Sequence, residues 1–141
     1  MINVDNAISV LKKNGYKYTD KRKNILAVFD HENRYLTAKD VQNQLKEDYP
    51  TISYDTIYRN LYTFVELDIL EETELNGEKL FRFNCAHHGH HHHFICVVCG
   101  RTKTIEMCPM DFFKNQLKDC EIESHRFEIF GKCEKCLAKQ L

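Results

Sequence analysis

The side chains best suited to chemistry are two CxxC pairs in the second half of the chain. The segment "CVVC" supplies Cys96 and Cys99, and "CEKC" supplies Cys133 and Cys136. Four thiolates suit tetrahedral Zn²⁺, and a closed shell of four sulfurs leaves no open position for a substrate. The spacing therefore predicts a structural zinc clip; the alternative is four buried or redox-active cysteines without a metal.

A run of histidines comes directly before the first pair, in "NCAHHGHHHHFICVVCG", residues 84–100. In an extended backbone His91 and His93 point to one face, and His90 and His92 point to the other. Two imidazole pairs on opposite faces cannot serve one ion. We therefore expect two further metal sites around this run.

The cysteines divide the chain. The 141 residues contain seven cysteines, an awkward number for a disulfide framework, and none lies before Cys85. We therefore expect two domains, residues 1–84 and 85–141, in a reducing cytoplasm with metal-bound thiolates. No apolar run is long enough for a membrane span. The net charge of −1 argues against a protein that coats nucleic acid by bulk electrostatics.

The first half carries helix signals. Thr37, with Asp40 three residues later, predicts a capped helix that runs to Pro50. Ser53 predicts the start of the next helix, whose apolar stripe runs from Ile57 to Val65. Arg59 falls on the opposite face of that second helix. Two helices with a short connection and an exposed arginine resemble a helix-turn-helix.

A hairpin follows these helices. Asn76-Gly77 separates two strand-like segments, which is a strong signal for a tight turn. Helix, helix and hairpin together make a winged helix. The segment "KKNGYKYTDKRK", residues 12–23, could contact phosphates or could be a solvated helix face. We expect DNA as the partner; a winged fold used for protein contacts is the alternative.

Between the two CxxC pairs, the pattern predicts a strand at 102–107, a helix opened by Pro109 and a strand at 121–131. In the second strand His125 has the parity of Phe127 and Ile129, which predicts that it points to a covered face. We expect a three-stranded antiparallel sheet with one helix and the zinc clip. Such a unit is small for a stable monomer.

Over essentially its whole length the chain resembles the ferric uptake regulator family, and most closely its zinc uptake regulator branch. The matching segments are "GYKYTDKR", "SYDTIYRNLYTFVELDIL", "FRFNCAHHGHHHHFICVVCG", "SHRFEIFGKC" and the closing "CEKC". The resemblance implies an α+β protein with an N-terminal winged helix-turn-helix domain and a small α/β dimerisation domain. It also implies a dimeric, metal-dependent transcriptional repressor that binds DNA and has no small organic substrate.

The resemblance also implies site residues. It implies a sensor site between the two domains, at a hinge, made by Glu71, Cys85, His91 and His93; Glu72 and Glu74 are alternatives to Glu71. It implies an additional metal site at His90, His92, Asp111 and His125. It implies DNA contacts by Lys17, Tyr58 and Arg59.

Two departures from the other branches favour zinc. Cys85 stands where the iron- and peroxide-sensing branches supply a carboxylate, and Tyr35 stands where the peroxide branch supplies a histidine. A thiolate with two imidazoles and one carboxylate favours Zn²⁺ over Fe²⁺ or Mn²⁺. We therefore expect a repressor that binds a palindromic operator as a dimer when zinc clamps the hinge, and that controls zinc uptake genes.

Other functions stay open. An iron- or peroxide-responsive regulator of the same family is one alternative, and a zinc storage or interaction module without DNA binding is another. A zinc hydrolase or deaminase would need HExxH, or HxE followed by PCxxC, and neither pattern occurs. We expect Cys108 and Cys120 to be structural.

Overall fold

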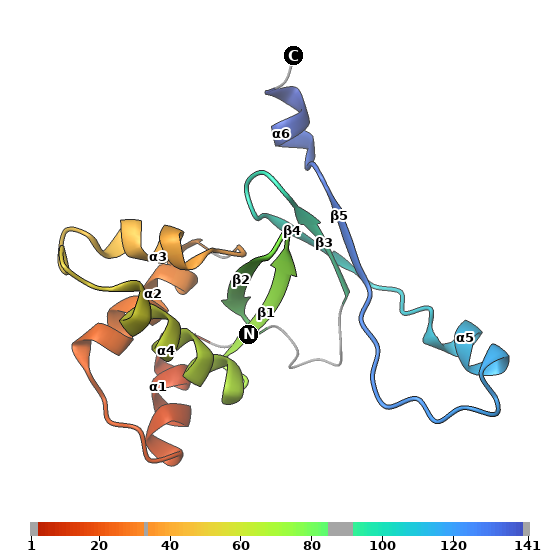
Figure 1. Cartoon of the computed structure of the whole chain (residues 1–141), viewed down its shortest axis with the longest axis horizontal. Coiled ribbons are helices and arrows are strands. Elements are labelled where there is room, and N and C mark those ends of the chain that lie inside the picture. Colours follow the sequence, from red (N-terminus) through yellow and green to blue (C-terminus); the bar gives the residue numbers. More distant parts are fainter. Residues whose placement is uncertain (1–2, 33, 85–91, 140–141) are drawn as a thin grey trace. The chain divides into compact units, whose positions relative to one another are not determined.

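A computed structural model describes residues 3–32, 34–84 and 92–139 of the chain. The chain divides into two compact units, which we call unit 1 (Met1–His87) and unit 2 (His88–Leu141). The described residues form four helices and a two-stranded hairpin in unit 1, and three strands and two short helices in unit 2; Figure 1 labels these elements along the chain. Among the described residues, no helix is long and apolar enough to cross a membrane.

Unit 1 begins with four helices, each with an apolar side that faces a common core. They are α1 (Val4–Lys13), α2 (Asp20–Glu32), α3 (Ala38–Leu45) and α4 (Tyr54–Glu66). The buried residues of α4 are Ile57, Leu61 and Phe64, as its predicted stripe requires. Burial of this stripe fixes which face of α4 remains outside.

The start signals of α3 and α4 are confirmed. Thr37 and Asp40 form a full capping box, in which each side chain accepts from the other residue's backbone N–H. The Ser53 side chain accepts from the backbone N–H of Thr56. The predicted extent of α3 to Pro50 was wrong, because the helix ends at Leu45. Residues 46–48 form turns, and Pro50 disfavours helical geometry only in Tyr49.

The predicted hairpin is also confirmed. β1 (Leu70–Leu75) pairs antiparallel with β2 (Glu78–Phe83), and Asn76 and Gly77 both have positive φ, 54° and 80°. Phe81 in β2 exchanges two backbone hydrogen bonds of 2.8 Å with Leu36. This bridge holds the wing to the helices, so unit 1 is a winged helix.

Unit 2 contains a sheet with the strand order β4-β3-β5. Its strands are β3 (His92–Cys96), β4 (Thr102–Ile105) and β5 (Glu128–Gly131), and its helices are α5 (Met110–Gln116) and α6 (Glu134–Ala138). The expected all-antiparallel sheet was wrong, because β5 runs parallel to β3. The chain reverses direction between β3 and β4 and again across the α5 segment. β5 therefore pairs with the edge of β3 opposite β4 and runs in the same direction as β3.

The expected strand at 121–131 was also too long. Only 128–131 pair with the sheet, and His125 lies in the irregular segment before β5 rather than in a strand. Within the described part of the chain nothing covers the expected inner face either, since Phe127 and Ile129 are both exposed. A strand's inner face needs a second layer, and α5 has no buried residue.

The two units differ greatly in core size. The core of unit 1 includes Phe29, Phe64 and Phe81, all fully buried. In the described part of unit 2, the buried cluster is Cys96, Cys133 and Cys136, with Phe94 and Cys99 packed against it. So little apolar burial cannot offset the chain entropy of this many residues. Unit 2 therefore depends on the cysteine cluster for its order.

Candidate metal centres and nucleic-acid interface

The four cysteines of the two CxxC pairs lie together, as their spacing predicted. Cys96 ends β3 and Cys99 lies in the following turn, whereas Cys133 is the N-cap of α6 and Cys136 lies inside it. All four Sγ atoms lie within 4.8 Å of one another. Because β5 runs beside β3, it delivers the second pair to the end of the strand that carries the first.

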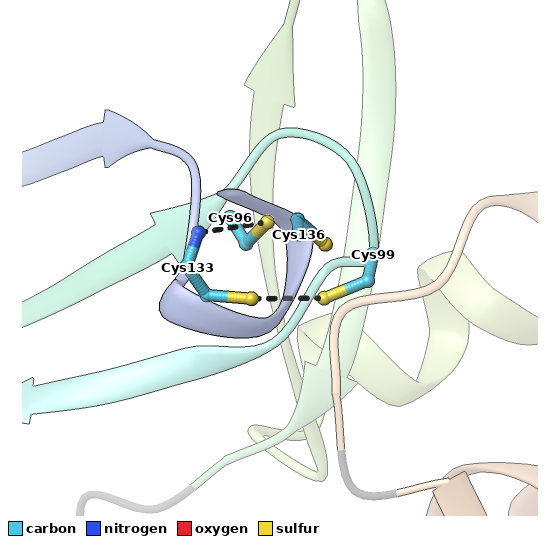
Figure 2. A group of neighbouring side chains, drawn as sticks. All are labelled: Cys96, Cys99, Cys133 and Cys136. Carbon is cyan, nitrogen blue, oxygen red and sulfur yellow. Dashed lines mark hydrogen bonds between the residues drawn. The ribbon is translucent and has the colours of Figure 1, made fainter. Parts of the chain in front are cut away.

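The sulfur positions fit a tetrahedral ion. The Sγ atoms of Cys99 and Cys133 are 3.8 Å apart, and Figure 2 shows them pointing toward each other. A Zn–S bond of about 2.3 Å in a tetrahedral shell requires an S···S separation of about 3.8 Å. The backbone N–H of Cys133 also donates to Cys96 Sγ at 3.4 Å. The group can therefore hold Zn²⁺ in a closed shell.

Without a bound cation these thiols conflict, because their surroundings lower the pKa of some and raise the pKa of another. Burial opposes ionisation of Cys96, but backbone N–H donors, first that of Cys133, lower its pKa from 9.0 to about 6. The backbone N–H of Cys136 lowers the pKa of Cys133. Burial and the neighbouring thiols raise the pKa of Cys136 to about 12. A divalent cation resolves this conflict, because it stabilises all four thiolates at once.

A second group of metal-binding side chains lies elsewhere in unit 2. It consists of His92, Cys108 and His125, whose donor atoms all lie within 4.8 Å of one another. His92 and His125 belong to the additional site that the resemblance implied. Asp111 is not in this group, and its side chain is 99% exposed. His90, the fourth residue of that implied site, lies outside the described residues.

Cys108 is the residue of this group that sequence reasoning missed. It lies between β4 and α5, in a segment without a strand or helix period to predict where it points. The available signal was chemical: Cys108 is a thiol in the half of the chain that also carries the two CxxC pairs and the histidine run. Only the path of the chain showed that it meets the two imidazoles.

Two of the four hinge residues lie outside the described residues, namely Cys85 and His91. His93 is buried in β3. Glu71 in β1 is opposite Arg82 in β2, and its Oε1 lies 3.4 Å from the Arg82 Nε. Glu71 is thus held by a buried arginine in unit 1. Recruitment of its carboxylate by a metal would compete with this ion pair.

The two neighbouring carboxylates of the wing are held less firmly than that of Glu71. Glu72 pairs with Lys79 across the hairpin at 3.4 Å, and Glu74 is exposed. Arg82 also lies over the ring of Tyr35, 5.6 Å from its centroid. Among the three candidate glutamates, Glu71 therefore has the most fixed side chain.

The outer face of α4 presents the residues expected to contact DNA. The Arg59 side chain is 73% exposed, and its Nη2 lies 3.0 Å from Asp55 Oδ2 one turn earlier. Tyr58 is half-buried and stacks on Tyr62, with ring centroids 5.8 Å apart. The Tyr62 ring packs against Phe81 of β2. This aromatic contact fixes the wing beside α4.

Two basic residues that the sequence analysis did not single out, Lys79 and Arg22, contact side chains of α4. Lys79, just after the hairpin turn, has its Nζ 5.2 Å from the Tyr62 ring centroid. Arg22 donates to the carbonyl of Lys17 at 2.6 Å and to the Asn60 side chain of α4 at 3.2 Å. Exposed Lys17 is therefore held close to α4, and Arg22 is committed to structure rather than free for phosphate.

Comparison with known proteins places the chain in a family. The model of the Ferric uptake regulator family matches residues 13–130. The chain belongs to the ferric uptake regulator family. It is 53% identical over 138 residues to the ferric uptake regulation protein of Staphylococcus epidermidis, which covers 98% of this chain and 99% of that protein.

Solved structures agree on the fold. A ferric uptake regulator from Francisella tularensis with iron superposes with a TM-score of 0.68 at 27% identity, over 87% of this chain and 96% of that one. A zinc uptake regulator complexed with zinc and DNA superposes with a TM-score of 0.72 at 18% identity, over 97% and 94%. This member of the ferric uptake regulator family is thus a metal-responsive transcription regulator and not an enzyme.

Arg59→Ala should weaken operator binding by about 1–3 kcal/mol and relax base preference, because an exposed arginine at mid-helix can grip a guanine. The fold should be unaffected, since an exposed i,i+4 pair contributes only about 0.3–0.5 kcal/mol. The measurement is fluorescence anisotropy with a palindromic duplex selected from a random library by the wild-type regulator. Arg101→Ala, which removes an exposed charge in unit 2, is the control. Wild-type affinity in Arg59→Ala would remove this residue from the interface.

Lys17→Ala should reduce affinity with little change in sequence preference, because one phosphate contact is lost. The slope of log affinity against log salt should become shallower by about 1. The measurement is the same anisotropy assay repeated across salt concentrations, with exposed Lys118→Ala of unit 2 as the matched control. An unchanged slope would show that Lys17 does not contact the DNA backbone.

Proposed function

We propose that the chain is a zinc-dependent repressor that binds palindromic operator DNA as a homodimer and controls zinc uptake genes. The observation that carries the choice of metal is the thiol of Cys85 in the proposed sensor set, beside Glu71, His91 and His93. A thiolate with two imidazoles and one carboxylate favours Zn²⁺ over Fe²⁺. The two described groups add four thiolates in one and two imidazoles with a thiolate in the other. Because these thiolates must stay reduced, the proposed location is the cytoplasm.

The surface of unit 2 supports a dimer. Large apolar side chains are exposed on α5 and around β5, among them Phe112, Phe113, Leu117, Ile129 and Phe130. Exposed apolar groups in this density are typical of a surface that another chain covers. A dimer presents two copies of α4, which suits two half-sites about 34 Å apart on a palindrome.

The proposed response to zinc rests on ligands from both units. Glu71 belongs to the wing, whereas His91 and His93 belong to the segment that enters unit 2; Cys85 lies between them in sequence. One ion bound to all four would restrict how the units move relative to each other. Without the ion, that order has to be established during DNA binding, and affinity falls.

Iron is the second candidate signal. It is favoured by the name of the 53% identical staphylococcal relative and by the iron in the Francisella structure. An iron-responsive repressor would use the same α4 face and the same dimer. The two proposals differ only in which ion raises operator affinity.

The deciding experiment is an operator-binding titration with controlled free metal. Protein that retains the metal of its four-cysteine site is mixed with a labelled palindromic duplex in the presence of a chelator, Zn²⁺, or anaerobic Fe²⁺. We expect Zn²⁺ to raise affinity about 5–150-fold, the usual range of coupling between two sites. A rise with Fe²⁺ alone would make the protein an iron regulator. Metal binding without any rise would make it a storage or interaction module.

A further inference from the structure

Three segments that are distant in sequence bring His92, Cys108 and His125 together. His92 opens β3, Cys108 precedes α5, and His125 precedes β5. His92 Nε2 lies 3.3 Å from Cys108 Sγ and 3.3 Å from His125 Nε2, and Cys108 Sγ lies 3.6 Å from His125 Nε2. The three donor atoms therefore form a nearly equilateral triangle.

This triangle has the dimensions of one face of a tetrahedral metal shell. Zn–N bonds of about 2.0–2.1 Å and a Zn–S bond of about 2.3 Å place two nitrogens about 3.4 Å apart, and nitrogen and sulfur about 3.6 Å apart. Hydrogen bonds explain such distances pair by pair. They do not require three donor atoms to converge on one point, as ligands of a common ion must.

The surroundings suit a bound ion. The His92 ring is buried and is held at 5.5 Å from the Phe127 ring in an edge contact. A cavity of about 380 Å³ lies beside Cys108 and His125, with Asp111 and Lys114 also on its wall. An ion bound to the three side chains would thus lie beside this cavity.

We propose that Cys108 is a metal ligand, and that His92, Cys108 and His125 bind a borderline-soft divalent ion of the Zn²⁺ class. The additional site implied by family resemblance uses the Asp111 carboxylate instead. In the structure this side chain is 99% exposed, its Oδ1 lies 3.9 Å from Lys114 Nζ, and it is not among the converging donor atoms. Exchange of a carboxylate for a thiolate makes the site softer, which disfavours Fe²⁺ and Mn²⁺.

On binding the ion, the Cys108 thiol releases its proton to solvent. Its Sγ then donates an electron pair to the ion, as the two neutral imidazoles do. The bound ion would then tie the segments on both sides of α5 to β3. Because all three ligands belong to unit 2, this site requires neither the hinge nor DNA, and it stands even if the proposed zinc response fails.

The test uses Co²⁺ as a spectroscopic probe of thiolate ligation. The starting protein is the full chain with Cys85→Ser, so that the proposed hinge thiolate is absent, and with Zn²⁺ retained in the four-cysteine site. Titration with Co²⁺ should produce a sulfur-to-cobalt charge-transfer band. Adding Cys108→Ser should abolish that band and weaken Co²⁺ binding at least ~10-fold. Cys120→Ser, the matched control at an exposed cysteine of the same unit, should keep the band.

Asp111→Asn separates the proposal from the carboxylate site, and it should also keep the band. If Cys108→Ser retains the band, or if Asp111→Asn abolishes it while Cys108→Ser does not, the proposal is overturned. A second measurement needs no change at Cys108. In the Cys85→Ser protein, Zn²⁺ should protect Cys108 from alkylation but leave Cys120 reactive. Equal alkylation of Cys108 with and without added Zn²⁺ would also overturn it.

Discussion

Cys133→Ser should remove the zinc of the four-cysteine site and unfold unit 2 while unit 1 remains folded. Cys133 supplies one of the four sulfurs and also donates its backbone N–H to Cys96. Structural zinc sites contribute about 10–16 kcal/mol of binding free energy, which is comparable to the whole stability of an ordinary domain, about 5–15 kcal/mol. The described core of unit 2 consists mainly of these cysteines, so little else holds it together.

Two measurements check this result. Zinc released on denaturation should fall by one ion per chain, and limited proteolysis should cut mainly after residue 88. Unit 1 should resist the protease, because its own core of aromatic and aliphatic side chains is intact. Cys120→Ser is the control, since Cys120 is exposed and outside both donor groups. A Cys133→Ser protein with full zinc content and wild-type protease resistance would rule out the structural assignment.

Cys85→Ser should have the opposite character: both units stay folded, and the response to zinc is lost. Serine offers a neutral hydroxyl where zinc prefers a thiolate, so the exchangeable ion of the proposed hinge site should no longer bind. The expected rise in operator affinity, about 5–150-fold with added zinc in the wild type, should disappear. Anisotropy titrations with zinc and with chelator measure this directly.

Two further variants show where the response arises. Glu71→Ala should reduce it in milder form, because one carboxylate is lost and the buried Arg82 is left without that partner. Asp111→Ala should affect it less, since Asp111 belongs to unit 2 and does not join the two units. If Cys85→Ser responds to zinc like the wild type, the sensor must lie in unit 2, and the hinge proposal fails.

The sequence by itself determined the features of unit 1 that depend on near neighbours. Thr37 with Asp40, and Ser53, cap the helices that they were expected to cap, because a side chain satisfies N–H groups only three residues away. Asn76-Gly77 determined the hairpin, because few residue pairs accept positive φ twice in a row. The apolar stripe of α4 determined which face Arg59 occupies.

The sequence also determined that four cysteines would meet, because two short CxxC turns each present two thiols toward one point. What it did not determine is the order and direction of the strands that carry them. β5 was expected to run antiparallel and to include His125, whereas it pairs parallel with β3 and begins at Glu128. Local alternation specifies the face of a strand but carries no information about its neighbour.

Only the tertiary structure decided the contact that most affects the metal chemistry. Cys108 meets His92 and His125 because the segments on either side of α5 return to the start of β3, 16 and 33 residues away in sequence. By contrast, Glu71 faces Arg82 because the two-residue hairpin turn, which the sequence already shows, sets their register. The meeting at Cys108 depends on where the chain returns in space, which residue types and local periodicity do not encode.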